Sequence, residues 1–69
     1  MPLSIAKAGE IKCIKKIGGK TETKQFLENL GFVAGGIVRV ISVIGGNMIV
    51  QIKESRVAIS REMASKIMI

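Results

Sequence analysis

Glycines divide much of this 69-residue chain into short segments. They stand at position 9, in the pair 18–19, at position 31, and in the pairs 35–36 and 45–46. Because glycine adopts the backbone conformations of tight turns, each of these points predicts a change of chain direction. The intervening segments are rich in isoleucine and valine, which favour strands. We therefore expect one small domain, residues 1–69, built mainly from short strands.

The segment 10–17 is predicted to be a strand with a bulge or a bend. Ile11 and Cys13 alternate with polar residues, as one face of a strand requires. Ile14 and Ile17 break this alternation, and the spacing of positions 11, 14 and 17 would also suit a short helix. The short length and the flanking glycines favour the bent strand. Cys13 then shares the apolar face, which predicts a buried structural thiol rather than a reactive one.

The segment 21–30 is the one good candidate for an α-helix. Thr21 can cap its first turn, and Glu22 places a negative charge where the helix dipole favours one. Three apolar residues share one face of this helix: Phe26, Leu27 and Leu30. Gly31 follows as a left-handed stop residue, and Phe32 should fold back over Leu27 or Phe26 in a Schellman motif.

The second half of the chain predicts a series of strands. Apart from Arg39 and Ser42, residues 37–44 are apolar at both parities, which indicates a strand that is buried on both faces or bends between two sheets. Gly45-Gly46-Asn47 is a hairpin signal, and the next strand directs Met48 and alternate residues to one side.

The last part of the chain should turn at 53–55 and form a further strand over 56–60. A short helical turn capped by Ser60 and a final strand near 67–69 complete the pattern. Five short strands joined by tight turns predict a small closed or half-open barrel.

The side chains needed for catalysis or metal binding are scarce. The chain has no histidine, one cysteine and five glutamates spread among cations, so neither a metal site nor an acid–base pair is expected. Gly18-Gly19-Lys20-Thr21 is similar to the end of a phosphate-binding loop, but Ile14 occupies the position of the first glycine that such a loop needs. We therefore predict a protein that is not an enzyme and that holds no cofactor.

The net charge of +6 points to an anionic partner: nucleic acid, an acidic membrane surface or an acidic protein. A basic barrel that binds single-stranded nucleic acid is one hypothesis, although both phenylalanines are predicted to be core or helix-stop residues and not stacking platforms. Weak self-association through a sheet edge at 66–69 is another. Without a signal peptide or an apolar run of membrane length, the chain is expected to be cytosolic.

Several phrases of the sequence, taken in order, resemble the FeoA family of ferrous iron transport proteins. They are Pro2-Leu3-Ser4, Ala8-Gly9-Glu10, the run Phe26-Leu27-Glu28-Asn29-Leu30-Gly31-Phe32 with Gly35, Val38-Arg39-Val40, and the ending from Arg56 to Ala64 with Ile67. The hairpin at 45–48 is shorter than is usual in the family, and Ser60 stands where leucine is common.

The resemblance implies an SH3-like barrel with a helix between its first two strands. It also implies a regulatory or accessory role beside a membrane ferrous iron permease that carries a cytosolic GTPase domain, which would recruit this protein to the membrane. We expect the partner to bind at the end of the helix and the loop after it. The predicted contact residues are Lys24, Leu27, Leu30, Gly31, Phe32, Val33 and Gly35.

Overall fold

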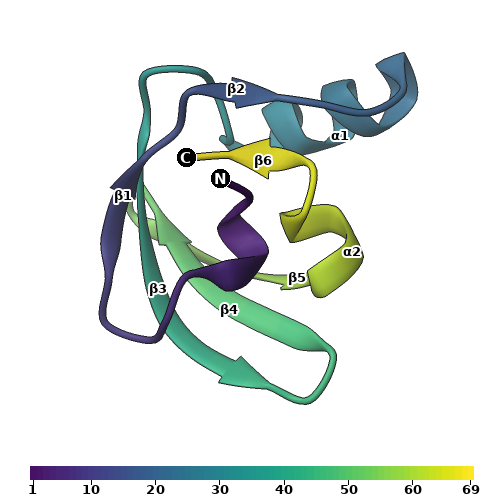
Figure 1. The fold of residues 1–69 in the computed structure, drawn as a ribbon. Helices are drawn as coiled ribbons and strands as arrows, with labels where there is room; N and C mark the ends of the chain where they lie inside the picture. Colours follow the sequence, from purple (N-terminus) through teal and green to yellow (C-terminus); the bar gives the residue numbers. More distant parts are fainter.

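The computed structural model describes all residues from Met1 to Ile69 and consists of two sheets packed around one core. The elements in chain order are η1 (Leu3–Ile5), β1 (Ile11–Cys13), β2 (Lys16–Ile17), α1 (Thr21–Leu30), β3 (Ile37–Ile44), β4 (Asn47–Ile52), β5 (Ser55–Ser60), α2 (Arg61–Ala64) and β6 (Ile67–Met68). The larger sheet has the order β1-β3-β4-β5, and β2 pairs with β6 in a second sheet (Figure 1). All of these pairs are antiparallel.

The predicted first strand is divided in two by the bend that its sequence indicated. β1 joins the larger sheet and β2 the smaller one, so the chain passes between the sheets at Ile14 and Lys15. Ile14 and Ile17 are buried, whereas Ile11 and Cys13 are exposed. The prediction of a buried Cys13 was therefore wrong, because the bend directs the later isoleucines into the core instead of the face shared by Ile11 and Cys13.

Helix α1 has the predicted bounds and the predicted end. The Gly31 N–H donates to the carbonyl of Glu28, the Phe32 N–H donates to the carbonyl of Leu27 at 3.0 Å, and Gly31 has a φ of +111°. These are the bonds of a Schellman motif, and they place Phe32 in the core. The start differs from the prediction, because Lys20 is the N-cap, with no side-chain cap, and Thr21 is already helical.

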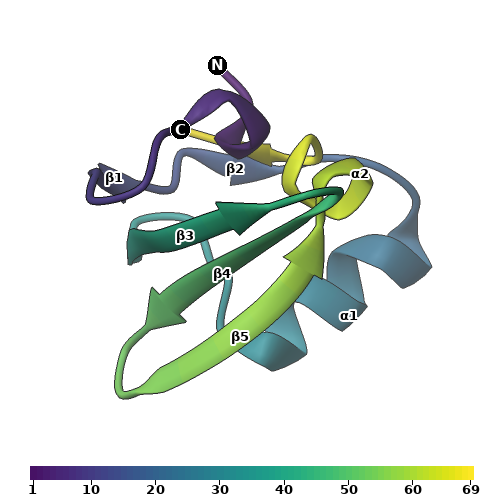
Figure 2. The ribbon, with the colours of Figure 1, turned by 90° about the horizontal axis from the view of Figure 1, so that it is seen from below.

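The β3–β4 hairpin turns at Gly45 and Gly46, and Met48, Val50 and Ile52 face the core as predicted. β3 is not buried on both faces. Ile37 at its start is 58% exposed, and a bulge between Val40 and Ser42 shifts its pairing with β4. The whole strand stays in the larger sheet, so the alternative prediction, a strand that bends between two sheets, was wrong as well. Figure 2 shows β3, β4 and β5 as one curved sheet with α2 at one end.

The core is a single cluster of fifteen buried residues, all of them apolar. It draws on both sheets, on η1 and on both α-helices, and its largest fully buried side chain is Phe32. Ser60 caps α2 as predicted, since its Oγ accepts a hydrogen bond from the Met63 N–H at 3.1 Å. Phe26 was expected in the core or at the helix stop, but it is 53% exposed because it lies outside the buried stripe of α1.

The two chain ends lie side by side and are joined by hydrogen bonds (Figure 1). The Ile69 N–H donates to the Met1 carbonyl at 2.7 Å, and the Met1 ammonium donates to the Ile69 carbonyl at 3.2 Å. Pro2 also forms a bridge with Met68, whose other edge pairs with β2. Both edges of β6 are therefore occupied, and the predicted self-association surface at 66–69 offers no free strand edge.

Candidate functional site: a groove beside the end of α1

An open groove of about 550 Å³ lies between the loop that follows α1 and the outer face of the larger sheet. The loop contributes Gly31, Val33, Gly35 and Gly36. The sheet and the turn after β4 contribute Ile11, Ile37, Arg39, Gln51, Ile52 and Lys53. Three separate stretches of the sequence, position 11, residues 31–39 and residues 51–53, thus meet at one surface.

The sheet wall of the groove is fixed by strand register. Ile11 on β1 pairs with Arg39 on β3, which pairs in turn with Gln51 on β4. Directly paired residues of an antiparallel sheet point to the same face, so these three side chains form one row across it. Ile37 and Arg39 are two residues apart on β3 and therefore share that face.

The loop wall is fixed by the end of the helix. A Cβ atom on Gly31 would lie 2.7 Å from Cγ2 of Ile52, so this glycine permits the loop to approach β4 closely. A hydrogen bond from the Gly35 N–H to the Ile14 carbonyl and another from the Ile14 N–H to the Gly36 carbonyl then tie the loop to the bend after β1. The loop wall thus packs closely against Ile52 at Gly31 and is held by main-chain hydrogen bonds at Gly35 and Gly36.

The chemistry of the groove combines exposed apolar side chains with positive charge. Ile11 is 54% exposed, Ile37 58% and Val33 38%, and Arg39 and Lys53 lie beside them with no carboxylate in the lining. These side chains are grouped at one hollow of the surface, which makes the groove a candidate contact site. The lining has no hydroxyl, thiol or carboxylate side chain, and its exposed aliphatic and cationic groups are suited to contact with another molecule.

The predicted contact residues divide into three groups. Gly31, Val33 and Gly35 line the groove. Leu30 is partly buried against the core and Lys24 is exposed on α1, and neither lines the groove. Leu27 and Phe32 have no exposed surface, so their side chains hold the helix end in place and offer a partner nothing to touch.

Sequence reasoning missed the sheet wall of the groove, in particular Ile11, Ile37, Arg39 and Lys53. One signal was available at position 37. Ile37 has the same strand parity as Arg39, which places it on the solvent face of the strand, where an exposed isoleucine indicates a candidate contact surface. Register between distant strands decides the rest, and that information is not local in the sequence.

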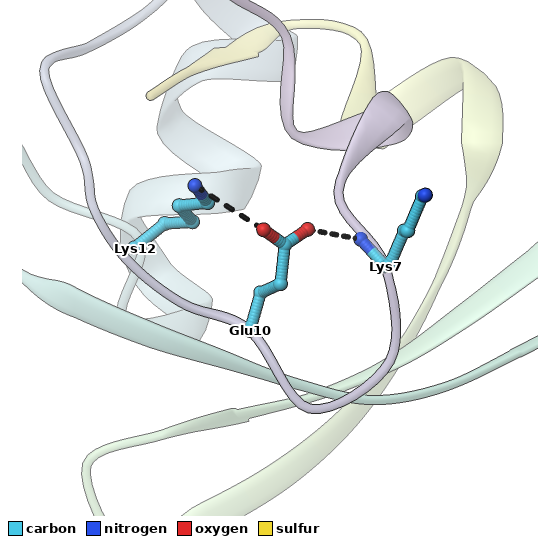
Figure 3. A network of polar contacts seen from close by, with 3 residues as sticks. All are labelled: Lys7, Glu10 and Lys12. Carbon is cyan, nitrogen blue, oxygen red and sulfur yellow. Dashed lines mark hydrogen bonds and ion pairs between the residues drawn. The ribbon is translucent and has the colours of Figure 1, made fainter.

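The one side-chain ion pair joins Glu10, in the turn before β1, to Lys12 on β1, and neither residue lines the groove. Glu10 accepts a hydrogen bond from the Lys7 main-chain N–H at 2.6 Å and pairs with the Lys12 ammonium at 3.4 Å (Figure 3). The main-chain hydrogen bond is the larger cause of a lowered pKa for Glu10, and the contact with Lys12 lowers it further. This arrangement stabilises the turn.

Cys13 is a free, exposed thiol, and no cluster of three or more histidine, cysteine, aspartate or glutamate side chains suited to a metal ion is present. Neither α1 nor α2 has the length and apolar character that crossing a membrane requires.

Comparisons with known proteins agree on one family and one fold. The FeoA domain model matches residues 1–69. A Methanocaldococcus jannaschii protein with the provisional name Fe(2+) transport protein A is 38% identical over 68 residues, which cover 99% of this chain and 83% of the relative.

Solved structures give the same result. The crystal structure of an iron uptake regulatory protein, FeoA, superposes with a TM-score of 0.91 at 24% identity and covers 97% of this chain and 91% of its own. Stenotrophomonas maltophilia FeoA in complex with zinc, described as a prokaryotic SH3 domain protein, gives a TM-score of 0.86 at 25% identity, with coverage of 97% and 86%. The predicted SH3-like, mainly β fold is confirmed.

Proposed function

The chain belongs to the FeoA family, and from this premise we propose that it is a non-catalytic accessory protein of ferrous iron uptake that acts by binding another protein. The proposed partner is a membrane ferrous iron permease with a cytosolic GTPase domain. The proposed place of action is the cytoplasm, at the inner face of the membrane. The S. maltophilia relative is itself described as a candidate activating factor for bacterial ferrous iron transport.

The observation that carries this proposal is the groove. It gathers exposed isoleucines and valine on a molecule whose core is already complete without them. Burying such side chains against a partner is favourable by about 25 cal/mol for each Å² of apolar surface removed from water. A protein that works through contact needs a surface of this kind, and the loop after α1, where the family resemblance is densest, forms one of its two walls.

Capture of the permease from detergent-solubilised membranes tests the proposal. The immobilised chain should retain the permease, with and without a GTP analogue, and Ile37→Ser or Val33→Glu should reduce its capture about tenfold, because each removes about one buried apolar side chain from the contact. Ile44→Ser is the matched control, since Ile44 is also on β3 and is 64% exposed but does not line the groove.

Two results would count against the proposal. One is that the intact chain retains no permease while it is folded, as shown by its circular dichroism. The other is that the Ile37 and Ile44 variants lose capture equally, because a general loss of surface hydrophobicity would then explain the effect.

The alternative of a basic nucleic-acid-binding module keeps one supporting observation, the exposed Phe26. Aromatic side chains at a surface can stack on unpaired bases. Such binding should weaken steeply with salt. A fluorescence titration with single-stranded oligonucleotides at low and high salt checks this alternative.

A further inference from the structure

We propose that the groove binds a segment of protein in which acidic residues flank an apolar anchor. This inference rests on the proposed function and specifies the chemistry of the partner at the same site. Three features of the groove carry it: its charge, its apolar floor and the backbone of one of its lysines.

The charge of the groove is of one sign. Arg39 and Lys53 line it, both are exposed, and no carboxylate is among the lining residues. Glu10, the carboxylate nearest in sequence to Ile11, is engaged by Lys7 and Lys12 in its own turn. An anionic partner therefore gains attraction here with no opposing charge in the lining, which favours acidic side chains and excludes basic ones.

The apolar part of the groove distinguishes a peptide from a phosphate backbone. Ile11, Ile37 and Val33 supply branched aliphatic surface, and the lining has no aromatic side chain on which a base could stack. Aliphatic pockets select aliphatic or aromatic anchors of a polypeptide. Together with the two cations, they fit an anchor residue with acidic neighbours.

The backbone of Lys53 supports a role for its side chain. It has a φ of +54° and is the only residue other than glycine with a positive φ. A side chain in this left-handed conformation costs free energy that a glycine would avoid, and such strain often marks a functional position. Lys53 lies in the two-residue turn between β4 and β5, where a glycine would satisfy the turn at lower cost.

Binding of short dye-labelled peptides to the full chain tests this inference, with 15N–1H spectra to locate the site. The probe has glutamates around a central leucine–isoleucine pair. One comparison peptide has lysines in place of the glutamates, and another has serines in place of the apolar pair. We expect only the glutamate peptide with its leucine–isoleucine pair to bind and to shift the amide signals of the residues that line the groove.

Variants of the chain separate binding from stability. Lys53→Gly should weaken binding of the acidic peptide about 2- to 5-fold, the effect of one partly exposed ion pair, while the denaturation midpoint stays unchanged or rises. Arg39→Gln should act similarly on binding. Ile37→Ser should weaken binding about tenfold, and Ile44→Ser should leave it unchanged.

The inference is overturned if the lysine peptide binds as tightly as the glutamate peptide, if Lys53→Gly and Arg39→Gln bind normally, or if an oligonucleotide occupies the groove in preference to the peptide. If Ile37→Ser and Val33→Glu still reduce capture of the permease in that case, the inference about acidic segments fails while the proposed function stands. If the acidic peptide binds as expected but no permease is captured, the proposed partner is wrong and the chemistry of the groove stands.

Discussion

At the scale of single residues, Gly31 has two roles. Its left-handed backbone ends α1 through the Schellman hydrogen bonds, and the absence of a side chain leaves room for Ile52. The first role is common to many helices, whereas the second is particular to this fold because it sets how closely the loop approaches β4. One residue therefore ends the helix and permits the close approach of the loop to Ile52.

Gly31→Ala should destabilise the fold by about 2–5 kcal/mol, since a left-handed alanine costs about 1–2 kcal/mol and crowding of a packed side chain adds about 1–3 kcal/mol. Gly46→Ala is the control, because that glycine has no positive φ and no atom within 4 Å of an added Cβ. Urea unfolding followed by circular dichroism measures both. Equal urea midpoints for the two variants would show that neither the left-handed backbone of Gly31 nor its close contact with Ile52 makes alanine unfavourable at this position.

At the scale of elements, the turn before β1 depends on one carboxylate. The folded pKa of Glu10 lies below its ordinary value of 4.5. In the unfolded chain the group binds its proton more readily, so its contribution to stability is present above about pH 4.5 and is lost as the pH falls through the lowered pKa.

Glu10→Gln should therefore be less stable than the natural sequence at neutral pH, and the difference between the two should shrink in acid. Comparing the two proteins at each pH removes the charge repulsion that both share in acid. Urea midpoints measured at neutral pH and near pH 3 check this expectation. A difference that stays constant over the range would mean that the charge of Glu10 contributes nothing to the turn.

The elements differ in how far the sequence predicts them. α1 and the β3–β4 hairpin are set by local signals, Gly31-Phe32 in one case and Gly45-Gly46 in the other, and both were predicted correctly. Cys13 and Phe26 are exposed, although Cys13 was predicted to be buried and Phe26 to lie in the core or at the helix stop. The exposure of Cys13 depends on how the first predicted strand bends, and that of Phe26 on which stripe of the helix faces the core. Of the groove, only residues of the loop wall were among the predicted contacts, because strands distant in the sequence complete the rest.

At the scale of the whole molecule, the core is closed by the chain ends. Leu3, Ile67 and Ile69 are buried, and the two terminal segments are paired with each other and, through β6, with β2. The first and last residues therefore take part in one hydrogen-bonded arrangement, even though most of the sequence lies between them.

This closeness has a consequence for the entropy of the unfolded chain. Folding brings the two ends together from a large number of separated arrangements, and a covalent link of a few glycine and serine residues would remove that loss in advance. For a ring of this size, loop-closure entropy predicts a gain in stability of up to about 4 kcal/mol, with the folded state unchanged. Urea unfolding of the cyclised protein beside its linear form, with the same linker left open, measures this gain. An equal midpoint would mean that the ends are already close together in the unfolded ensemble.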